Sequence, residues 1–413
     1  MSDLYSLALT TFTYGGDALG RLEDGRAVFV PYAIPGETVR VRLAEEKPRF
    51  ARAELVEVNN PSDARITPRC AHFGTCGGCH YQHIQYEAQL AAKMAILGEQ
   101  LERIGGLRDS LVLPTVPSPY PYYYRNYVQF HLSPDGKLGY HQAHSREVLA
   151  LQECHLPETM LNEIWPKLDF ETIADLERIG IRLGCQEEVQ LILESSDPIP
   201  PQLVVEELPV SVVHQSPAGS LVLVGSQAVT MEVLERPFRV SAGSFFQVNT
   251  RMAGIMVEHL LAAIPQYHPL TSQTILVDAY CGVGLFSAFL ANKVGQLVGI
   301  ESSPDAVEDF SANLDEFDNV SIYEATVEQV LAELDLKPDV ILVDPPREGI
   351  DRRALDSLLK RGDSFLVYVS CDPATLARDA RRLTAGGYRL AQITPFDLFP
   401  QTYHLESVSF WVR

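Results

Sequence analysis

Beyond residue 250, short apolar runs alternate with amphipathic segments of helical periodicity. The runs TILVDAY, LVGIES, VILVDPP and FLVYVSC are separated by stretches such as PDAVEDFSANLDEF and PATLARDARRLTAGG. Uninterrupted apolar strands need cover on both faces, and parallel strands need crossover connections, which the helical segments supply. The sequence therefore predicts an α/β fold, with a doubly wound, Rossmann-like domain over residues 236–413 that binds its ligand at the carboxyl ends of the strands.

The rest of the chain has two other sequence patterns. Residues 1–58 read as short alternating strands broken by turns, which predicts a small antiparallel β-barrel. A helix with a Gly-Gly end is predicted over 86–106, and the stretch after it is mostly strand-like. We therefore expect a β-rich central domain over 59–235, with a further helix inside it over 168–180.

Composition limits the classes of function. The 413 residues contain no run of 18 apolar residues and no leader-like N-terminus, so a cytoplasmic protein without membrane contact is expected. A monomer is also expected. Seven cysteines are too few for a secreted disulfide framework. The net charge of -21 excludes a general coat on nucleic acid but leaves room for a local basic groove. The arginines available for such a groove lie in KPRFAR and RITPR and at Arg347, Arg352, Arg353, Arg378, Arg381 and Arg382.

A glycine-bearing turn marks the candidate cofactor pocket. In VDAYCGVGLFS, a strand runs into a turn with Gly282 and Gly284 and then into a helix, so the backbone can approach a ligand. Glu301 ends the next strand, about twenty residues on, where a carboxylate accepts hydrogen bonds from a ribose diol. The third glycine of the dinucleotide pattern is missing, which favours the adenosine of S-adenosylmethionine over NAD. The alternative for Glu301 is an ordinary carboxylate at a helix start.

Two further strand ends carry candidate chemistry. Asp344 ends VILVDPP, where two prolines fix the backbone, so it either holds a base or methyl donor or simply terminates the strand. Cys371 ends FLVYVSC, and Asp372 opens the next helix, whose N-terminus is expected to lower the thiol pKa. Cys185 and Cys281 are interpreted as buried small hydrophobic residues instead.

A thiolate next to a methyl donor suits methylation of carbon 5 of uracil. That carbon is not nucleophilic, so a thiolate must first attack carbon 6 and create an enolate that can take a methyl group. A base must then remove the proton from carbon 5, so that elimination frees the enzyme. In FPQTYHLESVSFWVR, Glu406 is the candidate base and His404 competes with it.

A cluster of cysteines follows the predicted barrel. Cys70, Cys76 and Cys79 fall within ten residues, and Cys154 lies much further along the chain. The spacing C-x5-C-x2-C with one distant cysteine supplies four thiolates, which could hold zinc or an iron-sulfur cluster equally well.

Taken together, these motifs resemble the RNA uracil-C5 methyltransferase family, in particular its members with an N-terminal TRAM domain and a four-iron cluster. The resemblance covers nearly the whole chain. GDALGRLEDGRAVFVPYAIPGETVRVRL is similar to a TRAM domain, a small RNA-binding barrel, and CAHFGTCGGCHYQHIQYEAQLAAK to the family's cluster segment. YYYRNYVQFHL resembles the middle domain, GSFFQVNT the segment before the methyltransferase fold, and DPPREG, YVSCDPATLARD and FPQTYHLES the catalytic motifs.

The resemblance implies a role for each matching residue. Cys371 is implied as the nucleophile and Glu406 as the base. The residues implied to contact S-adenosylmethionine are Gln247, Tyr280, Glu301 and Asp344. The residues implied to hold a [4Fe-4S] cluster are Cys70, Cys76, Cys79 and Cys154. Two positions depart from the family pattern: Asp372 stands where Asn is usual, and Leu285 where a polar residue is common. Asp372 puts the charge near the thiolate in doubt, and Leu285 puts a side-chain contact with the cofactor in doubt.

The implied partner is RNA. We expect a uridine of 23S ribosomal RNA, with the T-loop of transfer RNA as the alternative, and the base must leave its stack to reach Cys371. The stretch YPYYYRN at 120–126 either stacks unpaired bases or lies half-buried in the core. The cluster is expected to be structural or to position RNA, because the reaction transfers no electrons. A cluster-bearing RNA-binding protein with a vestigial methyltransferase fold is the remaining alternative, and the retention of Cys371, Glu406 and Asp344 speaks against it.

Overall fold

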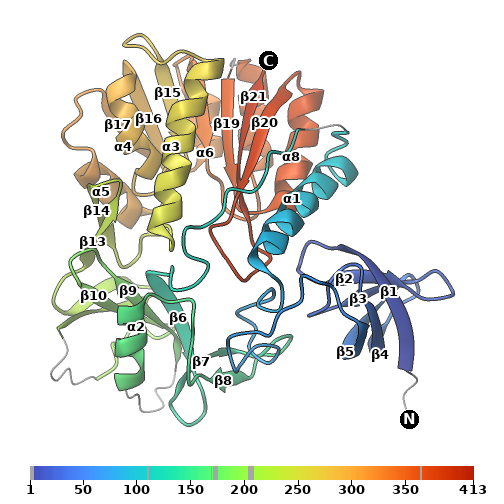
Figure 1. Cartoon of the computed structure of the whole chain (residues 1–413). Helices are drawn as coiled ribbons and strands as arrows, with labels where there is room; N and C mark the ends of the chain where they lie inside the picture. Colours follow the sequence, from blue (N-terminus) through green and yellow to red (C-terminus); the bar gives the residue numbers. More distant parts are fainter. Residues whose placement is uncertain (1–3, 109–110, 169, 171–174, 203–208, 363–364) are drawn as a thin grey trace.

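The chain folds into three parts, shown in Figure 1: a small barrel at the N-terminus, a β-sheet domain in the middle and a larger layered α/β domain at the C-terminus. This computed structural model describes residues 4–413 apart from 109–110, 169, 171–174, 203–208 and 363–364. Among the residues it describes, no helix is long and apolar enough to cross a membrane.

Five strands close into the N-terminal barrel, in the order β1-β2-β3-β5-β4. Side chains such as Leu7, Val28 and Val39 alternate into a single apolar core. The predicted small barrel is confirmed, although one of its pairs, β3 with β5, is parallel. The strands are β1 (Leu4–Phe12), β2 (Ala18–Arg21), β3 (Ala27–Val30), β4 (Thr38–Glu46) and β5 (Phe50–Asn60).

The central domain is built on a seven-stranded sheet with the order β12-β11-β10-β9-β6-β7-β8. The helix predicted over 168–180 is wrong where the structure describes it, because Leu176–Leu183 forms strand β9; residues 169 and 171–174 lie outside the described residues. β9 pairs with β6 on one edge and β10 on the other, and this pairing outweighs the local helical pattern. The remaining elements are β6 (Tyr127–Leu132), β7 (Leu138–His141), β8 (Val148–Ala150), α2 (Thr159–Ile164), a 3-10 turn (Trp165–Lys167), β10 (Val189–Ser195), β11 (Val210–Ser216) and β12 (Gly219–Val224).

The C-terminal domain has the predicted doubly wound architecture. Its sheet runs β17-β16-β15-β18-β19-β21-β20; the first five strands are parallel, and β21 and β20 are antiparallel additions at one side. Helices α3, α4 and α5 share one apolar core, and α6, α7 and α8 share another. The direction of winding reverses between β15 and β18, so a ligand crevice is expected at the carboxyl ends of these strands.

The bounds of the C-terminal elements follow the predicted runs. The helices are α3 (Thr250–Tyr267), α4 (Leu285–Leu290), α5 (Pro304–Asn313), α6 (Val327–Glu333), α7 (Arg352–Arg361) and α8 (Pro373–Ala385), with a 3-10 turn at Ala291–Lys293. The strands are β15 (Ile275–Ala279), β16 (Gln296–Glu301), β17 (Val320–Glu324), β18 (Val340–Val343), β19 (Phe365–Ser370), β20 (Arg389–Phe396) and β21 (Glu406–Val412). A hairpin of β13 (Ala228–Val233) and β14 (Arg236–Ser241) precedes them and packs on α5.

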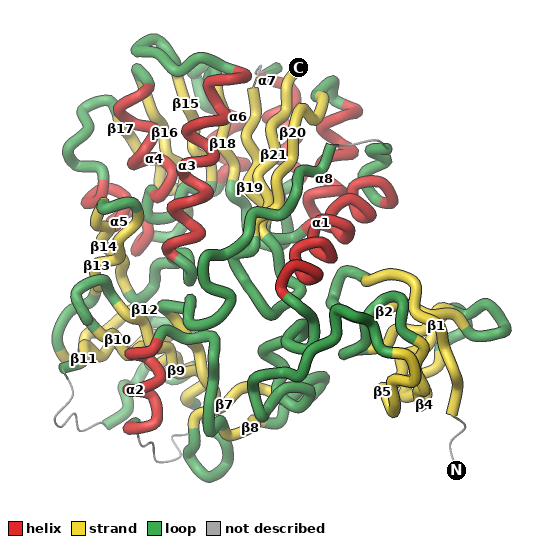
Figure 2. Tube along the Cα trace, viewed as in Figure 1, coloured by secondary structure: helices red, strands yellow, loops and turns green. Residues whose placement is uncertain are grey.

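Helix α1 (Tyr86–Arg103) packs on the C-terminal domain, although it lies between the barrel and the central domain in sequence. Leu97 and Leu101 belong to the same apolar core as α8, and Figure 2 shows the two helices side by side. The chain after α1 then runs along β20, where Leu113 N donates to Ile393 O at 2.9 Å. The segment between barrel and central sheet therefore buttresses the C-terminal domain.

Candidate active site

Three of the predicted site residues lie at neighbouring strand ends on the carboxyl edge of the C-terminal sheet. Asp344 follows β18, Cys371 follows β19, and Glu406 begins β21. Strands β19 and β21 are antiparallel, with Ser370 opposite Ser407. Cys371 and Glu406 are the next two residues in that register. The sheet thus brings the thiol and the carboxylate together from separate parts of the sequence.

Burial and mutual charge shape the proton affinities of these groups. Burial, followed by the charge of Asp344, raises the pKa of Glu406 well above its usual range. Burial and Asp278 raise the pKa of Asp344 to about 8. The pKa of Cys371 is raised to about 12, first by burial and then by Glu406 and Asp344, while Arg347 acts in the opposite direction. The three groups therefore share a site of low dielectric that favours the protonated form of each.

The prediction that a helix N-terminus lowers the thiol pKa is wrong. Asp372 Oδ1 accepts hydrogen bonds from Ala374 N at 3.0 Å and Thr375 N at 2.8 Å, so the first-turn donors of α8 are already satisfied. The same carboxylate offsets the positive end of the helix and adds a charge that raises the pKa of Cys371. The thiol must lose its proton before it can attack a base.

The barrel reaches the residue next to the candidate nucleophile. Tyr14, in the turn after β1, donates its hydroxyl proton to Asp372 Oδ2. The Tyr14 ring also meets the Tyr403 ring edge-on, with centroids 5.8 Å apart. Sequence reasoning missed Tyr14, because nothing local in the barrel indicates a contact with the far end of the chain.

The two candidate bases differ in proton affinity. Burial, with the charge of Arg347, lowers the pKa of His404 to about 3, whereas the pKa of Glu406 is raised. A general base is most effective when its pKa lies near the working pH. The environment therefore favours Glu406 over His404 as the proton acceptor.

The glycine turn after β15 holds the backbone in conformations that let a ligand approach it closely. Gly284 has φ +90°, and a Cβ there would lie 2.4 Å from Leu314 Cδ1, so only glycine fits. Gly282 N donates to Glu301 Oε2 at 3.1 Å. The other oxygen of Glu301 accepts from Ser302 N at 2.7 Å and from Ser303 N, so the carboxylate spans the glycine turn and the start of α5. The contacts with Ser302 and Ser303 match the interpretation as a carboxylate at a helix start, and the ribose contact stays a prediction.

A buried aspartate beside this turn was missed by the sequence reasoning. Asp278 Oδ2 accepts from Ser287 Oγ at 2.6 Å, while Oδ1 is buried without a hydrogen-bond partner among the described residues. Burial raises the pKa of Asp278 to about 7, and Glu301 contributes to the rise. The signal was an acid within the apolar run TILVDAY, where most acids would be excluded. Asp278, Glu301 and Asp344 form an acidic group at the strand ends, with Asp278 coupled to both others.

The other implied cofactor residues lie around the same edge. Tyr280 has φ +64°, and its hydroxyl is buried without a hydrogen-bond partner in the described part of the chain. Gln247 is buried just before α3, and its backbone oxygen accepts from Asn126 Nδ2 at 3.1 Å. Leu285, which stands where a polar residue is common in the family, is buried in the apolar core with the rest of α4 and contributes to its packing. Cys281 is buried as predicted, but Cys185 is exposed, which corrects the interpretation of that thiol.

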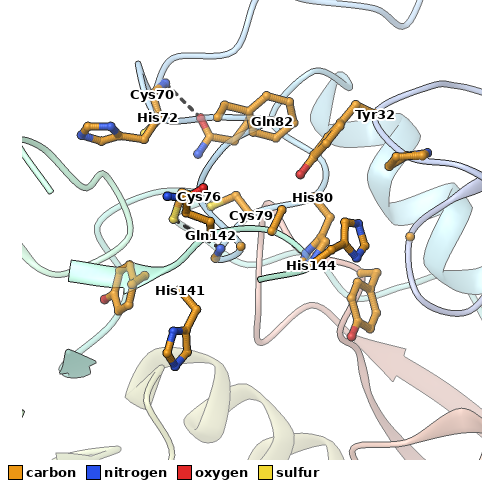
Figure 3. Close-up of a pocket in the computed structure, with 18 of the residues that line it drawn as sticks. Tyr32, Cys70, His72, Cys76, Cys79, His80, Gln82, His141, Gln142 and His144 are labelled. Atoms are coloured by element: carbon orange, nitrogen blue, oxygen red, sulfur yellow. Dashed lines mark hydrogen bonds between the residues drawn. The ribbon is translucent and has the colours of Figure 1, made fainter. Parts of the chain in front are cut away.

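The four clustered cysteines line one cavity of about 620 Å³ between the barrel and the central domain. Figure 3 shows Cys70, Cys76 and Cys79 around it. Burial raises the pKa of Cys79 to about 12, and the charges of Cys154, Cys76 and Cys70 add to the rise, so the four thiols face a common space. Within the described residues, however, no three His, Cys, Asp or Glu side chains are grouped so that they could hold a metal ion.

The predicted RNA-stacking tyrosines divide by exposure. Tyr120 is half exposed, and the Arg251 guanidinium lies 4.2 Å from its ring centroid. Tyr122 and Tyr123 are partly buried under Arg69, and Tyr124 is buried. Tyr120 is therefore the member most available to stack on an unpaired base.

Several of the arginines proposed for a basic groove have acidic partners. Arg378 pairs with Asp379, and Arg382 pairs with Asp356. Arg347, by contrast, acts electrostatically on both Cys371 and Glu406. It is the arginine that the structure brings to the candidate active site.

The architecture by itself defines a class of protein. The doubly wound domain has a glycine turn and acidic strand ends, and it carries a thiol beside a buried carboxylate. Together with the attached small barrel, these features indicate a methyltransferase that acts on nucleic acid. The chain belongs to the tRNA (uracil-5-)-methyltransferase family, whose model matches residues 201–413, and a TRAM domain matches residues 7–56. It is an RNA methyltransferase, as the resemblance of its motifs predicted.

Individual relatives cover almost all of the chain. An uncharacterized RNA methyltransferase of Thermosynechococcus vestitus is 34% identical, over 98% of this chain and 96% of its own. One from Aquifex aeolicus is also 34% identical, over 98% and 97%. The crystal structure of Pyrococcus abyssi tRNA (uracil-54, C5)-methyltransferase in complex with S-adenosyl-L-homocysteine is 23% identical, covers 99% of this chain and 100% of its own, and gives a TM-score of 0.73. The fold is therefore shared along the whole chain.

Proposed function

We propose that this protein uses S-adenosylmethionine to methylate carbon 5 of a uridine in 23S ribosomal RNA, through a covalent bond from Cys371 to the base. One observation carries the proposal: Ser370 pairs with Ser407 at the end of the β19–β21 register, so the adjoining residues Cys371 and Glu406 lie together at the strand ends, where Glu406 raises the pKa of Cys371. A thiol and a buried carboxylate at this spacing supply the nucleophile and the base that methylation of an unreactive ring carbon requires.

Each residue of the pair has a defined task. Cys371 loses its proton to solvent, and its sulfur bonds to carbon 6 of uracil, so that the ring electrons move toward the carbonyl oxygen at carbon 4. When bound, S-adenosylmethionine supplies the methyl group as an electrophile for carbon 5. Glu406 then takes the proton from carbon 5, the ring double bond re-forms, and the bond to Cys371 breaks. The positive charge of Arg347 lowers the pKa of both residues and offsets negative charge during these steps.

The acidic group at the strand ends fits a cationic cofactor. Asp278 is a buried carboxyl and Asp344 a partly buried one; their pKa values are raised to about 7 and about 8, and an oxygen of Asp278 has no partner among the described residues. A sulfonium and an ammonium group would offset their charges. The buried Tyr280 hydroxyl offers a further hydrogen bond. Glu301 and Gln247 complete the set that we assign to the cofactor, with Glu301 on the ribose.

The RNA substrate is the finer part of the proposal. The barrel and the cysteine cavity, as parts of the family resemblance, support 23S ribosomal RNA, whereas the family description and the Pyrococcus abyssi relative name transfer RNA. Nucleotide mass mapping of RNA from a deletion strain should reveal the loss of one 5-methyluridine in 23S ribosomal RNA. The purified protein with S-adenosylmethionine should restore it. Loss in the T-loop would select the transfer RNA alternative, and methylation of another base or atom would contradict the proposed chemistry.

We also propose that the four cysteines hold a [4Fe-4S] cluster. A single zinc ion needs its sulfur ligands about 2.3 Å from one point, and the described residues provide no such convergent group. A four-iron cluster is larger and is held at its corners by separate thiolates, which suits four cysteines spread around one cavity. The cluster would tie Cys79 in the segment after the barrel to Cys154 in the central domain.

Protein purified without oxygen should be brown and contain iron. Cys79→Ser should lose most of this iron, because it removes a ligand that shares the cavity with the other three thiols. Cys185→Ser is the matched control, since Cys185 is exposed and lies away from the cavity. Iron content and visible absorption measure both variants. Colourless protein with stoichiometric zinc would overturn the cluster assignment.

A further inference from the structure

A fully buried lysine lies behind the candidate base. Lys93, on α1, is 0% exposed, and its Nζ has three acceptors. These are Asp397 Oδ1 at 2.5 Å, His404 O at 2.6 Å and Phe399 O at 3.1 Å. All three acceptors belong to the loop between β20 and β21, which ends at Glu406.

The acid that pairs with this lysine is itself fixed on both oxygens. Tyr86 donates its hydroxyl proton to Asp397 Oδ2 at 2.8 Å and accepts from Ser118 N at 2.8 Å. Lys93 and Tyr86 both lie on α1, so one rigid helix holds the start of the loop. The same lysine reaches forward to the His404 carbonyl, close to the other end of the loop.

A second pair holds the middle of the loop against the same helix. Gln89 Nε2 donates to Gln401 Oε1 at 3.0 Å, and Gln401 N donates to Gln89 Oε1 at 3.1 Å. Gln401 has φ +70°, a conformation that costs energy for a residue other than glycine and persists when its surroundings determine it. His80 N and Tyr81 N, directly after Cys79, donate to Gln401 O at 2.9 Å and 3.0 Å.

Stability alone does not account for this arrangement. Replacing a buried ion pair by apolar residues of similar volume is often neutral or stabilising, so such a pair is weak evidence for a stabilising role. The Lys93 ammonium also has a directional task, since it joins two carbonyls and a carboxylate of one short loop. The loop sets where β21 begins, and therefore where the Glu406 carboxylate lies relative to Cys371.

We propose that Lys93 and Asp397 are positioning residues that fix the loop between β20 and β21, so that Glu406 faces the carbon 5 proton of the Cys371 adduct. This inference rests on the proposed function. It predicts that loss of the ammonium slows proton removal but leaves bond formation by Cys371 intact. Misplacement of a catalytic group by about 1 Å can cost about a hundredfold in rate.

The test separates the two chemical steps in the full-length holoprotein. Covalent complex formation with 5-fluorouridine RNA measures the bond from Cys371, and tritium release from RNA labelled at carbon 5 of uridine measures proton removal. Lys93→Met should form the complex within about twofold of the wild-type rate, yet release tritium about a hundredfold more slowly. With ordinary RNA its adduct should accumulate, and the KM for RNA should fall together with kcat, because a later step limits turnover. Asp397→Asn keeps the shape of the acid and should show the same pattern more weakly.

Arg361→Met is the matched control. Arg361 donates to the backbone carbonyls of Leu331, at 3.0 Å, Leu336, at 2.7 Å, and Leu334, but it ends α7 and makes none of these bonds to the loop between β20 and β21. It should leave the ratio of the two rates at the wild-type value. Equal loss of both rates in Lys93→Met and Asp397→Asn, or no loss in either, would overturn the inference; if Lys93→Met does not fold, Asp397→Asn decides. Failure of the wild-type protein to form any complex would instead overturn the proposed function.

Discussion

Replacing Cys371 by Ala should abolish methyl transfer to RNA, with turnover reduced by at least about 10³-fold. Without the sulfur, no bond forms to carbon 6 of uracil, and carbon 5 stays unreactive toward the methyl donor. Incorporation of labelled methyl groups into RNA measures the loss. A denaturing gel with 5-fluorouridine RNA should show a covalent complex for the wild-type protein and none for the variant, because the fluorine at carbon 5 blocks the elimination that frees the enzyme.

One control variant and the pH dependence of the wild-type protein bear on this result. Cys185→Ala removes an exposed thiol of the central domain and should keep the wild-type rate. The wild-type complex should also form faster as the pH rises, because the pKa of Cys371 is raised to about 12 and the thiolate fraction grows toward that value. A Cys371→Ala protein that still forms the complex, or still makes product at an undiminished rate, would show that another group attacks the base.

Glu406→Gln should trap the protein on its RNA. Glutamine keeps the shape of the side chain but cannot take the proton from carbon 5, so the adduct forms and does not resolve. Turnover is expected to fall by about 10² to 10⁴-fold, the usual contribution of a general base. The measurement is the fraction of protein that stays covalently attached to ordinary uridine RNA under denaturing conditions, together with the rate of 5-methyluridine formation.

The double variant Cys371→Ala with Glu406→Gln provides the control for this trap. It should show no attached RNA, because the bond that Glu406 normally helps to break is never made. Unimpaired turnover of the Glu406→Gln protein would instead move the role of base to His404 or to water. The low pKa of His404, about 3, argues against its acting as the proton acceptor.

The parts of the fold that depend on local pattern were predictable. Apolar runs such as TILVDAY and FLVYVSC became strands β15 and β19, and the small alternating strands before residue 60 became the barrel. Asp344, after the run VILV, and Cys371, at the end of FLVYVSC, lie at the carboxyl edge of the sheet because every parallel strand presents the same end there. Each of these residues could therefore be predicted from the sequence of its own strand.

Residue properties that depend on surroundings were predicted less well. The pattern of 168–180 predicts a helix, but Leu176–Leu183 forms strand β9, because β6 and β10 pair with both of its edges. Cys185 is exposed, although cysteine is commonly buried. The pKa of Cys371 is raised although a helix starts beside it, because Asp372 satisfies the helix donors and carboxylates surround the thiol.

The sequence by itself determined which residues end the strands, which turns carry glycine, and which residue types are available for chemistry, since these depend on neighbours along the chain. Only the tertiary structure decided that Cys371 faces Glu406, that Tyr14 of the barrel reaches Asp372, and that Lys93 holds the loop before the base. Each of these contacts depends on strand register or packing between segments that are distant along the chain. Such pairings have no local periodicity, so they arise only when the sheet and the domains assemble.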